Sequence, residues 1–397
     1  MRLFPLLQEH NKYNNSYGTI PLQGKTPKYH VANKYKPFLA IIDFLGAVIF
    51  FFNRLRKQPD NPKKILLIRL DHLGDIIMTL PTYAAIRRLY PEAQIHTLVR
   101  SFTQDVFYNN KNIDKVILFD PPWFARDKKI SFSDTIRFLL KLRKEKYDLI
   151  IELHADPRNI LAATFIGGYK VGYGIRGLGF LFNKIVNYPQ FNHLVEINLN
   201  IIRALGYKEK TLLNALTLQY GQADEMAVRK YIKTPFVIIN PGTGRPNKYW
   251  MPERWAKVAD ILAKQGYSII LTGSKTDISE CKKITNLMKQ KAILLAGKTT
   301  IRQLFVLIKK AKLVLAPDTS IAHFCACLGI PSITLFGPIP SAICSYESRI
   351  HKVIVKTLPC SYCAQPICPR TDNPDECMRL ISAEEVAQLA QQMLTSF

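Results

Sequence analysis

The chain has 397 residues, 48% of them hydrophobic, and its 55 Lys and Arg against 30 Asp and Glu give a net charge of +25. This length suits two folded domains with additions, and the composition excludes a low-complexity or disordered chain. The charge predicts an anionic partner; because no nucleic-acid recognition motif accompanies it, we expect an acidic membrane or a phosphorylated substrate and no nucleic acid.

Residues 1–57 form a basic extension with one apolar segment. Residues 1–36 are polar and basic and lack the pattern of a secretory signal. The apolar stretch 38–52 contains Asp43 and, at about fifteen residues, is shorter than the roughly twenty that span a membrane. Basic residues flank it, namely Lys34, Lys36, Arg54, Arg56 and Lys57. Two interpretations stay open: a helix lying in the interface of an anionic membrane, and a helix packed on the protein's own core.

Residues 58–225 alternate between strand and helix patterns. Strands are predicted at 65–70, 95–100, 115–119 and 148–154, and helices at 76–90 and 133–146. This alternation predicts an α/β domain with a doubly wound parallel sheet, whose site lies outside the carboxyl ends of the strands.

The turn after the first predicted strand carries Asp71, His72 and Asp75 around Gly74. Helix starts in this position more often bind phosphate, so two carboxylates call for another role. A cap of the following helix or an ion pair with Arg69 is one interpretation of Asp71, and contact with a substrate is the other. His72 is interpreted as a surface residue.

Residues 226–381 form a second predicted domain of the same class, with the boundary between 220 and 234. Strands are predicted at 236–240, 267–273, 292–297, 312–318 and 331–337, each followed or ended by Gly, Pro or Asp. A final helix is predicted at 382–397, with Ser382 as its cap and Glu385 three residues later.

Two strand ends in this second domain suit a diphosphate. Gly242 and Gly244 allow backbone N–H groups to approach an anion, and Lys248 adds a positive charge. The segment after residue 317 opens a helix with Asp318, Thr319, Ser320 and His323. Each pattern alone is usually only a turn or a cap, but the two are expected on successive crossovers of one sheet.

Four cysteines near the end of the chain, Cys360, Cys363, Cys368 and Cys377, have the spacing C-x2-C-x4-C-x8-C. Without an export signal a disulfide framework is not expected. The loop 360–377 either holds a structural metal through four thiolates or is a reduced structural loop. Structural zinc sites usually have two close pairs of cysteines, whereas this loop has a single close pair.

The segments "ILLIRLDHLGDIIMTLP", "NPGTGRPNKYWMPERW" and "APDTSIAHFCACLGIPSITLFGP" resemble, in order and spacing, the ADP-heptose:lipopolysaccharide heptosyltransferases, the ninth glycosyltransferase family. The resemblance runs from about Lys64 to the carboxyl end and includes the cysteine-bearing tail. It implies two Rossmann-like domains facing across a cleft (the GT-B fold), the acceptor in the first domain, the donor nucleotide in the second, and transfer with inversion without a required metal.

Carried over by position, the resemblance makes Asp75 the catalytic aspartate. Lys248 matches the lysine that meets the donor phosphates, and Thr243 falls near the nucleotide-binding threonine. Asp318, Thr319 and His323 match the motif that holds sugar and diphosphate, with Ser320 where some members have glycine. Asp71, His154, Asp156 and Arg158 are the further candidates for binding an acidic acceptor.

The resulting expectation is an inverting enzyme that moves heptose from ADP-heptose to a lipopolysaccharide core or related glycolipid. It would work in the cytoplasm, peripherally on the inner face of the membrane, with its carboxylate as base and its cations on the leaving diphosphate. The alternatives are a transferase of the same fold that uses another nucleotide sugar, and a non-catalytic protein that binds membranes or anions.

Overall fold

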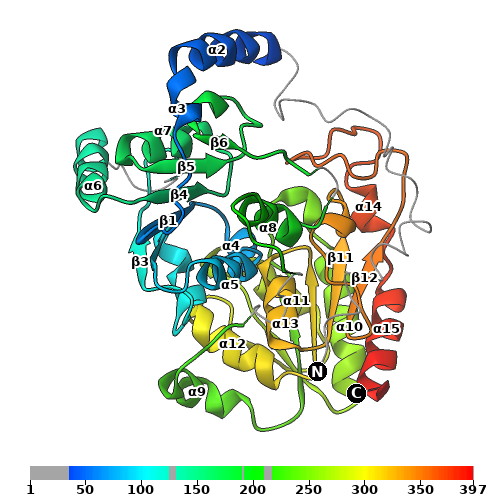
Figure 1. The fold of residues 1–397 in the computed structure, drawn as a ribbon. Helices are drawn as coiled ribbons and strands as arrows, with labels where there is room; N and C mark the ends of the chain where they lie inside the picture. The colour runs from blue at the N-terminus through cyan, green and yellow to red at the C-terminus, as the bar shows by residue number, and fades with distance from the viewer. Residues whose placement is uncertain (1–34, 125–130, 190–191, 210–216, 397) are drawn as a thin grey trace. The chain divides into compact units, whose positions relative to one another are not determined.

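The computed structural model describes residues 35–124, 131–189, 192–209 and 217–396. The chain divides into two compact units. We call the described residues up to 209 the N-terminal unit and those from 217 onward the C-terminal unit, and each is described by itself (Figure 1).

The N-terminal unit contains a six-stranded sheet in the order β3-β2-β1-β4-β5-β6, in which every neighbouring pair is parallel. Its strands are β1 (Lys64–Arg69), β2 (Gln94–Val99), β3 (Lys115–Leu118), β4 (Leu149–Glu152), β5 (Tyr169–Gly172) and β6 (Lys184–Ile185). Its helices are α2 (Lys36–Ile49), α3 (Phe51–Leu55), α4 (Leu73–Ile77), α5 (Leu80–Leu89), η2 (Ser101–Phe107), α6 (Phe132–Lys144), α7 (Pro157–Ile166), η3 (Gly179–Leu181) and α8 (Leu194–Ala204). The central strands β1 and β4 are almost wholly buried, as expected for a parallel sheet covered on both faces.

The C-terminal unit repeats this plan with the order β12-β11-β10-β7-β8-β9, again parallel throughout. Its strands are β7 (Phe236–Ile239), β8 (Ser268–Leu271), β9 (Ala292–Leu294), β10 (Leu313–Pro317), β11 (Ser332–Phe336) and β12 (His351–Val355). Its helices are α9 (Gln222–Val228), η5 (Arg229–Tyr231), η6 (Pro246–Lys248), α10 (Pro252–Lys264), η7 (Lys275–Asp277), α11 (Ile278–Leu287), α12 (Ile301–Lys310), α13 (Ser320–Leu328), η8 (Ser341–Ile343), α14 (Glu376–Arg379) and α15 (Ala383–Ser396). The two sheets confirm the predicted α/β class and its pair of Rossmann-like domains.

The last helix is anchored where the sequence predicts. The Glu385 N–H donates to Ser382 Oγ at 3.1 Å, so Ser382 caps α15. The buried Trp250 and Trp255 rings meet edge to face, and Trp250 Nε1 donates to the Ile381 carbonyl at 2.9 Å. These contacts hold the start of α15 in the core of the C-terminal unit.

The predicted helix 76–90 is wrong in its continuity, because the structure has α4 and α5 in its place. Pro81 lies in the first turn of α5, where its missing N–H leaves no hydrogen bond unmade. The break at residues 78–79 keeps α4 a short element at the carboxyl edge of β1.

The apolar N-terminal segment forms α2 and α3 within the N-terminal unit. One face of α2 packs on η3 and α7, where Ile42 and Ala47 meet a cluster that includes Ile160 and Phe180. In the part of the chain that the structure describes, no helix is both long and apolar enough to cross a membrane.

Candidate active site

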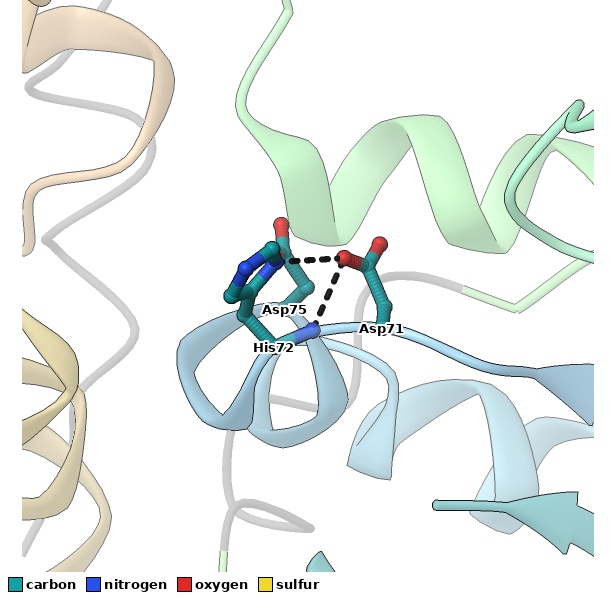
Figure 2. A group of neighbouring side chains, drawn as sticks. All are labelled: Asp71, His72 and Asp75. Carbon is teal, nitrogen blue, oxygen red and sulfur yellow. Dashed lines mark hydrogen bonds and ion pairs between the residues drawn. The ribbon is translucent and has the colours of Figure 1, made fainter. Parts of the chain in front are cut away.

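The turn between β1 and α4 holds two carboxylates at the carboxyl edge of the first sheet (Figure 2). Asp71 lies two residues after the end of β1, and Asp75 lies within α4. The His72 N–H donates to Asp71 Oδ1 at 2.8 Å, and His72 Nδ1 lies 3.1 Å from the same oxygen. Because His72 occupies the cap position of α4 and no side chain caps the helix, the interpretation of Asp71 as a helix cap is wrong.

Arg69 lies between the two carboxylates. Its Nη2 is 3.1 Å from Asp71 Oδ2 and 3.6 Å from Asp75 Oδ1, and its Nη1 donates to the Leu153 carbonyl. The predicted ion pair between Arg69 and Asp71 is therefore present. The side chain of Asp71 is 8% exposed, whereas that of Asp75 is 30% exposed. Asp75 is thus the more accessible carboxylate of the two.

The surroundings drive the pKa values of the two carboxyls apart. Burial alone would raise the pKa of Asp71, but Arg69 and the hydrogen bond from His72 outweigh it and hold that pKa well below its usual range. Desolvation raises the pKa of Asp75 to about 6; the Asp71 carboxylate adds to the rise and Arg69 opposes it. Asp71 thus stays ionised while Asp75 takes up and releases a proton near neutral pH.

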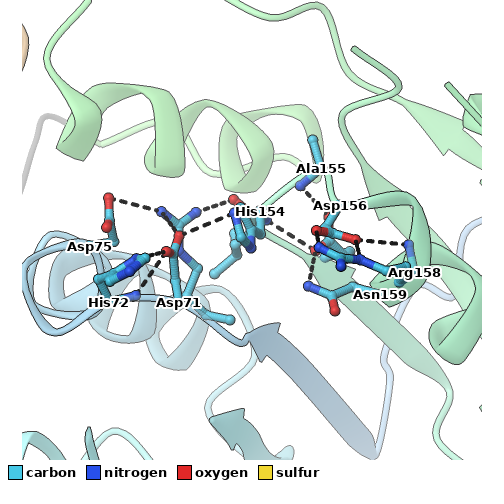
Figure 3. Close-up of polar contacts among 11 residues, drawn as sticks. Asp71, His72, Asp75, His154, Ala155, Asp156, Arg158 and Asn159 are labelled. Atoms are coloured by element: carbon cyan, nitrogen blue, oxygen red, sulfur yellow. Dashed lines mark hydrogen bonds and ion pairs between the residues drawn. The ribbon is translucent and has the colours of Figure 1, made fainter. Parts of the chain in front are cut away.

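A second buried carboxylate, Glu152, ends β4 beside this turn. It accepts hydrogen bonds from the N–H groups of His154 at 3.1 Å and Ala155 at 2.6 Å and from Asn159 Nδ2 at 3.3 Å (Figure 3). Ala155 has φ 57°, an uncommon left-handed conformation for a residue with a Cβ. Burial raises the pKa of Glu152 to about 7. Glu152 therefore fixes the sharp turn that carries His154.

His154 points from this turn toward Asp71. Its Nε2 lies 3.5 Å from Asp71 Oδ2, and its ring stacks on Phe124 with centroids 5.8 Å apart. Burial lowers the pKa of His154 to about 4, so the ring is neutral at pH 7. Its Nδ1 is buried and has no hydrogen-bond partner among the described residues. Of the four predicted acceptor residues, Asp71 and His154 therefore lie together.

Asp156 and Arg158 form a separate pair at the start of α7 (Figure 3). Asp156 Oδ1 accepts from the Arg158 N–H at 2.9 Å and so caps the helix, and the Arg158 guanidinium binds the same carboxylate through Nε at 2.9 Å and Nη2 at 2.6 Å. The Arg158 side chain is 48% exposed, and its guanidinium lies 4.9 Å from the ring centre of Phe124. Asp156 thus has a structural role, while Arg158 is open to solvent.

In the C-terminal unit, two strand ends come together through an ion pair. Lys248, at the end of η6 after β7, pairs with the carboxylate of Asp318, which follows β10. Lys248 Nζ also donates to the Asp318 carbonyl at 3.2 Å, and the two side chains are only 13% and 9% exposed. A cation and a carboxylate that the sequence separates by seventy positions thus share one buried contact.

Next to this pair, α13 presents polar groups without partners. Thr319 occupies the cap position of α13 without capping it, and Ser320 is the first helical residue. Thr319 Oγ1 and His323 Nδ1 are buried and make no hydrogen bond to any residue that the structure describes. Burial lowers the pKa of His323 to about 4, which leaves its ring neutral. A small pocket lies beside them and is lined by Asp318, His323, Cys344 and Tyr346 among others.

In the turn after β7, side-chain packing explains the glycine at position 242, which the sequence alone does not. A Cβ at Gly242 would lie 2.3 Å from Asp277 Cγ, so any other residue would force the Asp277 side chain to move. A Cβ at Gly244 would meet nothing within 4 Å. Thr243, half-buried, has its Oγ1 3.4 Å from the Arg245 N–H.

The four clustered cysteines line one small pocket together with Arg370 and Glu376, which form an ion pair. None of the four forms a disulfide. Among the described residues, the set of three or more His, Cys, Asp or Glu whose ligand atoms lie within 4.8 Å of one another is Asp71, His72 and Asp75. The four thiols thus share a pocket without converging, whereas the three converging groups have the Arg69 cation beside them.

Sequence reasoning missed Glu152 as part of the site. Its signal was a single charged residue inside the apolar run "DLIIELH", since an acidic side chain in a buried strand needs several donors. Asn159, seven residues later in α7, supplies one of these donors but has no signal in the sequence.

The family described as Glycosyltransferase family 9 (heptosyltransferase) matches residues 135–371, more than half of the chain. The chain is 25% identical over 334 residues to lipopolysaccharide heptosyltransferase 3 of Escherichia coli K12, covering 81% of this chain and 95% of that protein.

Solved structures share the fold. The ADP-heptose lps heptosyltransferase II of E. coli is similar with a TM-score of 0.70 at 20% identity, covering 84% of this chain and 99% of that one. The E. coli heptosyltransferase WaaC, solved with ADP-2-deoxy-2-fluoro heptose, has a TM-score of 0.62 at 18% identity and covers 83% and 99%.

Proposed function

The chain belongs to glycosyltransferase family 9, the heptosyltransferases, and from that premise we propose that it transfers heptose from ADP-heptose to a hydroxyl of a lipopolysaccharide core or related acidic glycolipid, with inversion. The observation that carries the proposal is the contrast between the two carboxyls beside Arg69. One is held ionised and the other has its pKa raised to about 6, in the range of a general base at neutral pH.

In this reaction Asp75 would remove the proton of the acceptor hydroxyl. The hydroxyl oxygen would attack the anomeric carbon of heptose from the face opposite the diphosphate, forming the new C–O bond as the bond to the phosphate oxygen breaks. ADP would leave with the electron pair of that bond, and the proton would remain on Asp75 until water takes it. The inversion follows from attack on the opposite face.

The residues of the C-terminal unit would meet the donor. Lys248 would stabilise the charge that develops on the departing diphosphate, together with the free N–H groups at the start of α13. Thr319 Oγ1 and His323 Nδ1 are buried polar atoms without a hydrogen-bond partner among the described residues, and a bound sugar diphosphate would supply one. Asp318 would hold Lys248 in place through their ion pair.

The residues of the N-terminal unit would meet the acceptor. Arg158 is the half-exposed cation at the carboxyl edge of the first sheet and suits the acidic groups of a glycolipid. His154, neutral and with an unpartnered Nδ1, suits a sugar hydroxyl. Thr243 and Ser320 would contact the donor's nucleotide and sugar. We place the reaction at the cytoplasmic face of the membrane, because nucleotide sugars are cytoplasmic and a glycolipid acceptor is held in a bilayer.

The test is incubation of the purified protein with ADP-heptose and a panel of defined core acceptors, followed by mass spectrometry. We expect an acceptor product heavier by one heptose, with the anomeric configuration inverted by NMR. Transfer from another nucleotide sugar in preference to ADP-heptose would overturn the donor assignment. Binding of ADP-heptose without any transfer, on every acceptor, would favour the non-catalytic alternative.

A further inference from the structure

Helix α2 is fixed to the N-terminal unit by a specific inner face. Its only carboxylate, Asp43, accepts a hydrogen bond from the Leu178 N–H at 2.9 Å. A Cβ at Gly46 would lie 2.4 Å from the Phe180 ring, so glycine permits the close approach of helix and ring. The side chain of Leu39 fills the space beside Gly177 in the same way. These contacts leave one orientation of the helix about its axis.

The opposite face of α2 and the following α3 are apolar and exposed. We define the α2–α3 apolar surface by the side chains Phe38, Ile41, Phe44, Val48, Phe52 and Leu55. Phe44 is 69% exposed, Val48 64% and Phe52 79%. A helix that is apolar on all sides is normally covered on all sides, and single exposed apolar residues do not form such a run.

The charges around this surface indicate what covers it. Between residues 36 and 57 Asp43 is the single acidic residue, and it faces inward, whereas Arg54, Arg56 and Lys57 are exposed where α3 ends. Apolar side chains with basic residues at their border suit the boundary between acyl chains and anionic headgroups. The net charge of +25 acts in the same direction.

The inner face of α2 also connects this surface to the acceptor side of the proposed site. η3 and the loop before it follow the carboxyl end of β5, at the same sheet edge as Asp71 and His154. Arg176, in that loop, contributes to lowering the pKa of His154, while Gly177 and Leu178 next to it contact α2. A bilayer that contacted α2 would therefore lie at the edge of the sheet where the acceptor would bind.

We propose that the α2–α3 apolar surface docks on an anionic lipid bilayer and so presents the acceptor edge of the N-terminal unit to a lipid-embedded substrate. The docking itself is independent of the chemistry; its effect on turnover rests on the proposed function. The helix lies in the interface and does not cross the bilayer, in keeping with its length.

The experiment measures binding of the full chain to vesicles without donor or acceptor. The probes are vesicles of phosphatidylcholine with about one-third phosphatidylglycerol, and vesicles of phosphatidylcholine alone. We expect sedimentation with the anionic vesicles, weakened as salt rises from about 0.1 M to 1 M because exposed charges are screened. The triple variant Phe44→Ser, Val48→Ser, Phe52→Ser should bind more than about tenfold more weakly, since it removes three apolar side chains from the interface.

The matched control is the triple variant Phe132→Ser, Met226→Ser, Leu287→Ser, which removes three apolar side chains that are 75%, 61% and 47% exposed elsewhere on the molecule. It should bind vesicles like the wild type. All three proteins should have equal melting temperatures, because the replaced side chains are exposed. Equal vesicle binding by the Phe44, Val48, Phe52 variant and the wild type would overturn the proposal.

Two further outcomes are decisive. A dimer in the absence of lipid that dissociates in the Phe44, Val48, Phe52 variant would overturn the proposal and assign the surface to a second copy of the chain. If docking serves turnover, the variant should lose transfer to an acceptor embedded in anionic vesicles by about tenfold or more and keep transfer to a soluble acceptor. If the wild type transfers heptose to neither acceptor, the proposed function is refuted, and the measured vesicle binding remains valid.

Discussion

At the scale of single residues, the turn after β1 separates two carboxyls of one type by their surroundings. Asp71 is buried against Arg69 and His72, and Asp75 is four residues further on, partly exposed and less strongly paired. The negative charge of Asp71 raises the pKa of Asp75, while Arg69 keeps this rise moderate. Two groups that differ in this way suit one fixed charge and one proton acceptor.

The first prediction replaces Asp75 by Asn, which keeps the size of the side chain and removes the base. kcat should fall by a factor of about 10² to 10⁴, and the dissociation constant for ADP-heptose, measured by calorimetry, should stay unchanged. Asp71→Asn is the matched control and should have the milder effect. Normal turnover by Asp75→Asn together with an inactive Asp71→Asn would show that Asp71 is the catalytic base and Asp75 is not.

The pH dependence of the reaction is the second prediction. The base must be deprotonated to act, and the pKa of Asp75 is raised to about 6, so kcat/KM should rise with pH and level off above that value. Asp71→Asn removes the neighbouring negative charge, which lowers the pKa of Asp75 and shifts the rising limb to lower pH. A rising limb that does not move in this variant would contradict the coupling between the two carboxyls.

A third prediction concerns Glu152 and stability. Because burial raises its pKa in the folded protein to about 7, the stability that Glu152 contributes is complete below its unfolded pKa of about 4.3 and is lost as pH rises through about 7. The free energy of unfolding of the wild type relative to Glu152→Gln should therefore fall over this range, by at most about 4 kcal/mol. Urea unfolding at several pH values measures it.

The control for Glu152 is Glu145→Gln. Lys64 lowers the pKa of Glu145 by a side-chain hydrogen bond, so its contribution to stability is gained as pH rises and lost as pH falls. The two variants should therefore show opposite slopes with pH. A slope of the same sign in both would refute the buried, high-pKa state of Glu152.

At the scale of elements, the sequence predicted the strands with the clearest apolar runs and missed β5, β6 and β12. β1, β2 and β7 begin and end within one or two residues of the prediction, because they are buried on both faces. β6 has only two residues, and β5 contains Lys170 and lies between glycines, so neither has a recognisable pattern. The parallel pairing of β5 with β4 and of β6 with β5 comes from tertiary contacts and not from local sequence.

The site was predictable where one element carries it and not where elements meet. Asp71 and Asp75 share one turn, and the turn alone drew attention to them. The contact between Lys248 and Asp318 depends on β7 and β10 being neighbours in the sheet, which periodicity does not reveal. The pairing of Arg158 with Asp156 likewise appears only in the structure.

The loop 360–377 carries the fourth prediction. Its four thiols line one pocket but do not converge within the distance that three metal ligands need. We expect the purified protein to contain four titratable thiols from this loop and to keep its melting temperature when a chelator is added. About one equivalent of bound metal, together with a lower melting temperature after chelation, would establish the metal site instead.

At the scale of the whole molecule, the two units repeat one architecture with different chemistry at the strand ends. The N-terminal unit has carboxylates around Arg69 where the C-terminal unit has Lys248 and the start of α13. The N-terminal unit would bind the acceptor, whose hydroxyl loses a proton. The C-terminal unit would bind the donor, whose diphosphate gains negative charge.

This division gives the fifth prediction, measured by thermal shift with ADP. ADP should raise the melting temperature of the wild type and of Asp75→Asn equally, because Asp75 is assigned to the acceptor and its replacement should leave the affinity of the folded protein for ADP unchanged. Lys248→Ala should lose most of the shift, and in kinetics its donor KM should rise while kcat falls. Lys257→Ala, which breaks an exposed ion pair with Glu384 in the same unit, should respond to ADP like the wild type. An unchanged shift in Lys248→Ala would remove Lys248 from the donor site.

The close fit between α2 and η3 has a practical consequence for anyone who handles this protein. Shortening the chain to begin after residue 57 would take away an exposed apolar surface, which looks favourable for solubility. It would also uncover Phe180 and leave the Leu178 N–H without the Asp43 carboxylate. The shortened protein would therefore expose a new apolar surface in place of the one removed. Replacing outward side chains such as Phe44 and Phe52 by serine while keeping Asp43 and Gly46 leaves that inner contact closed, and is the better route to a well-behaved sample for crystallisation.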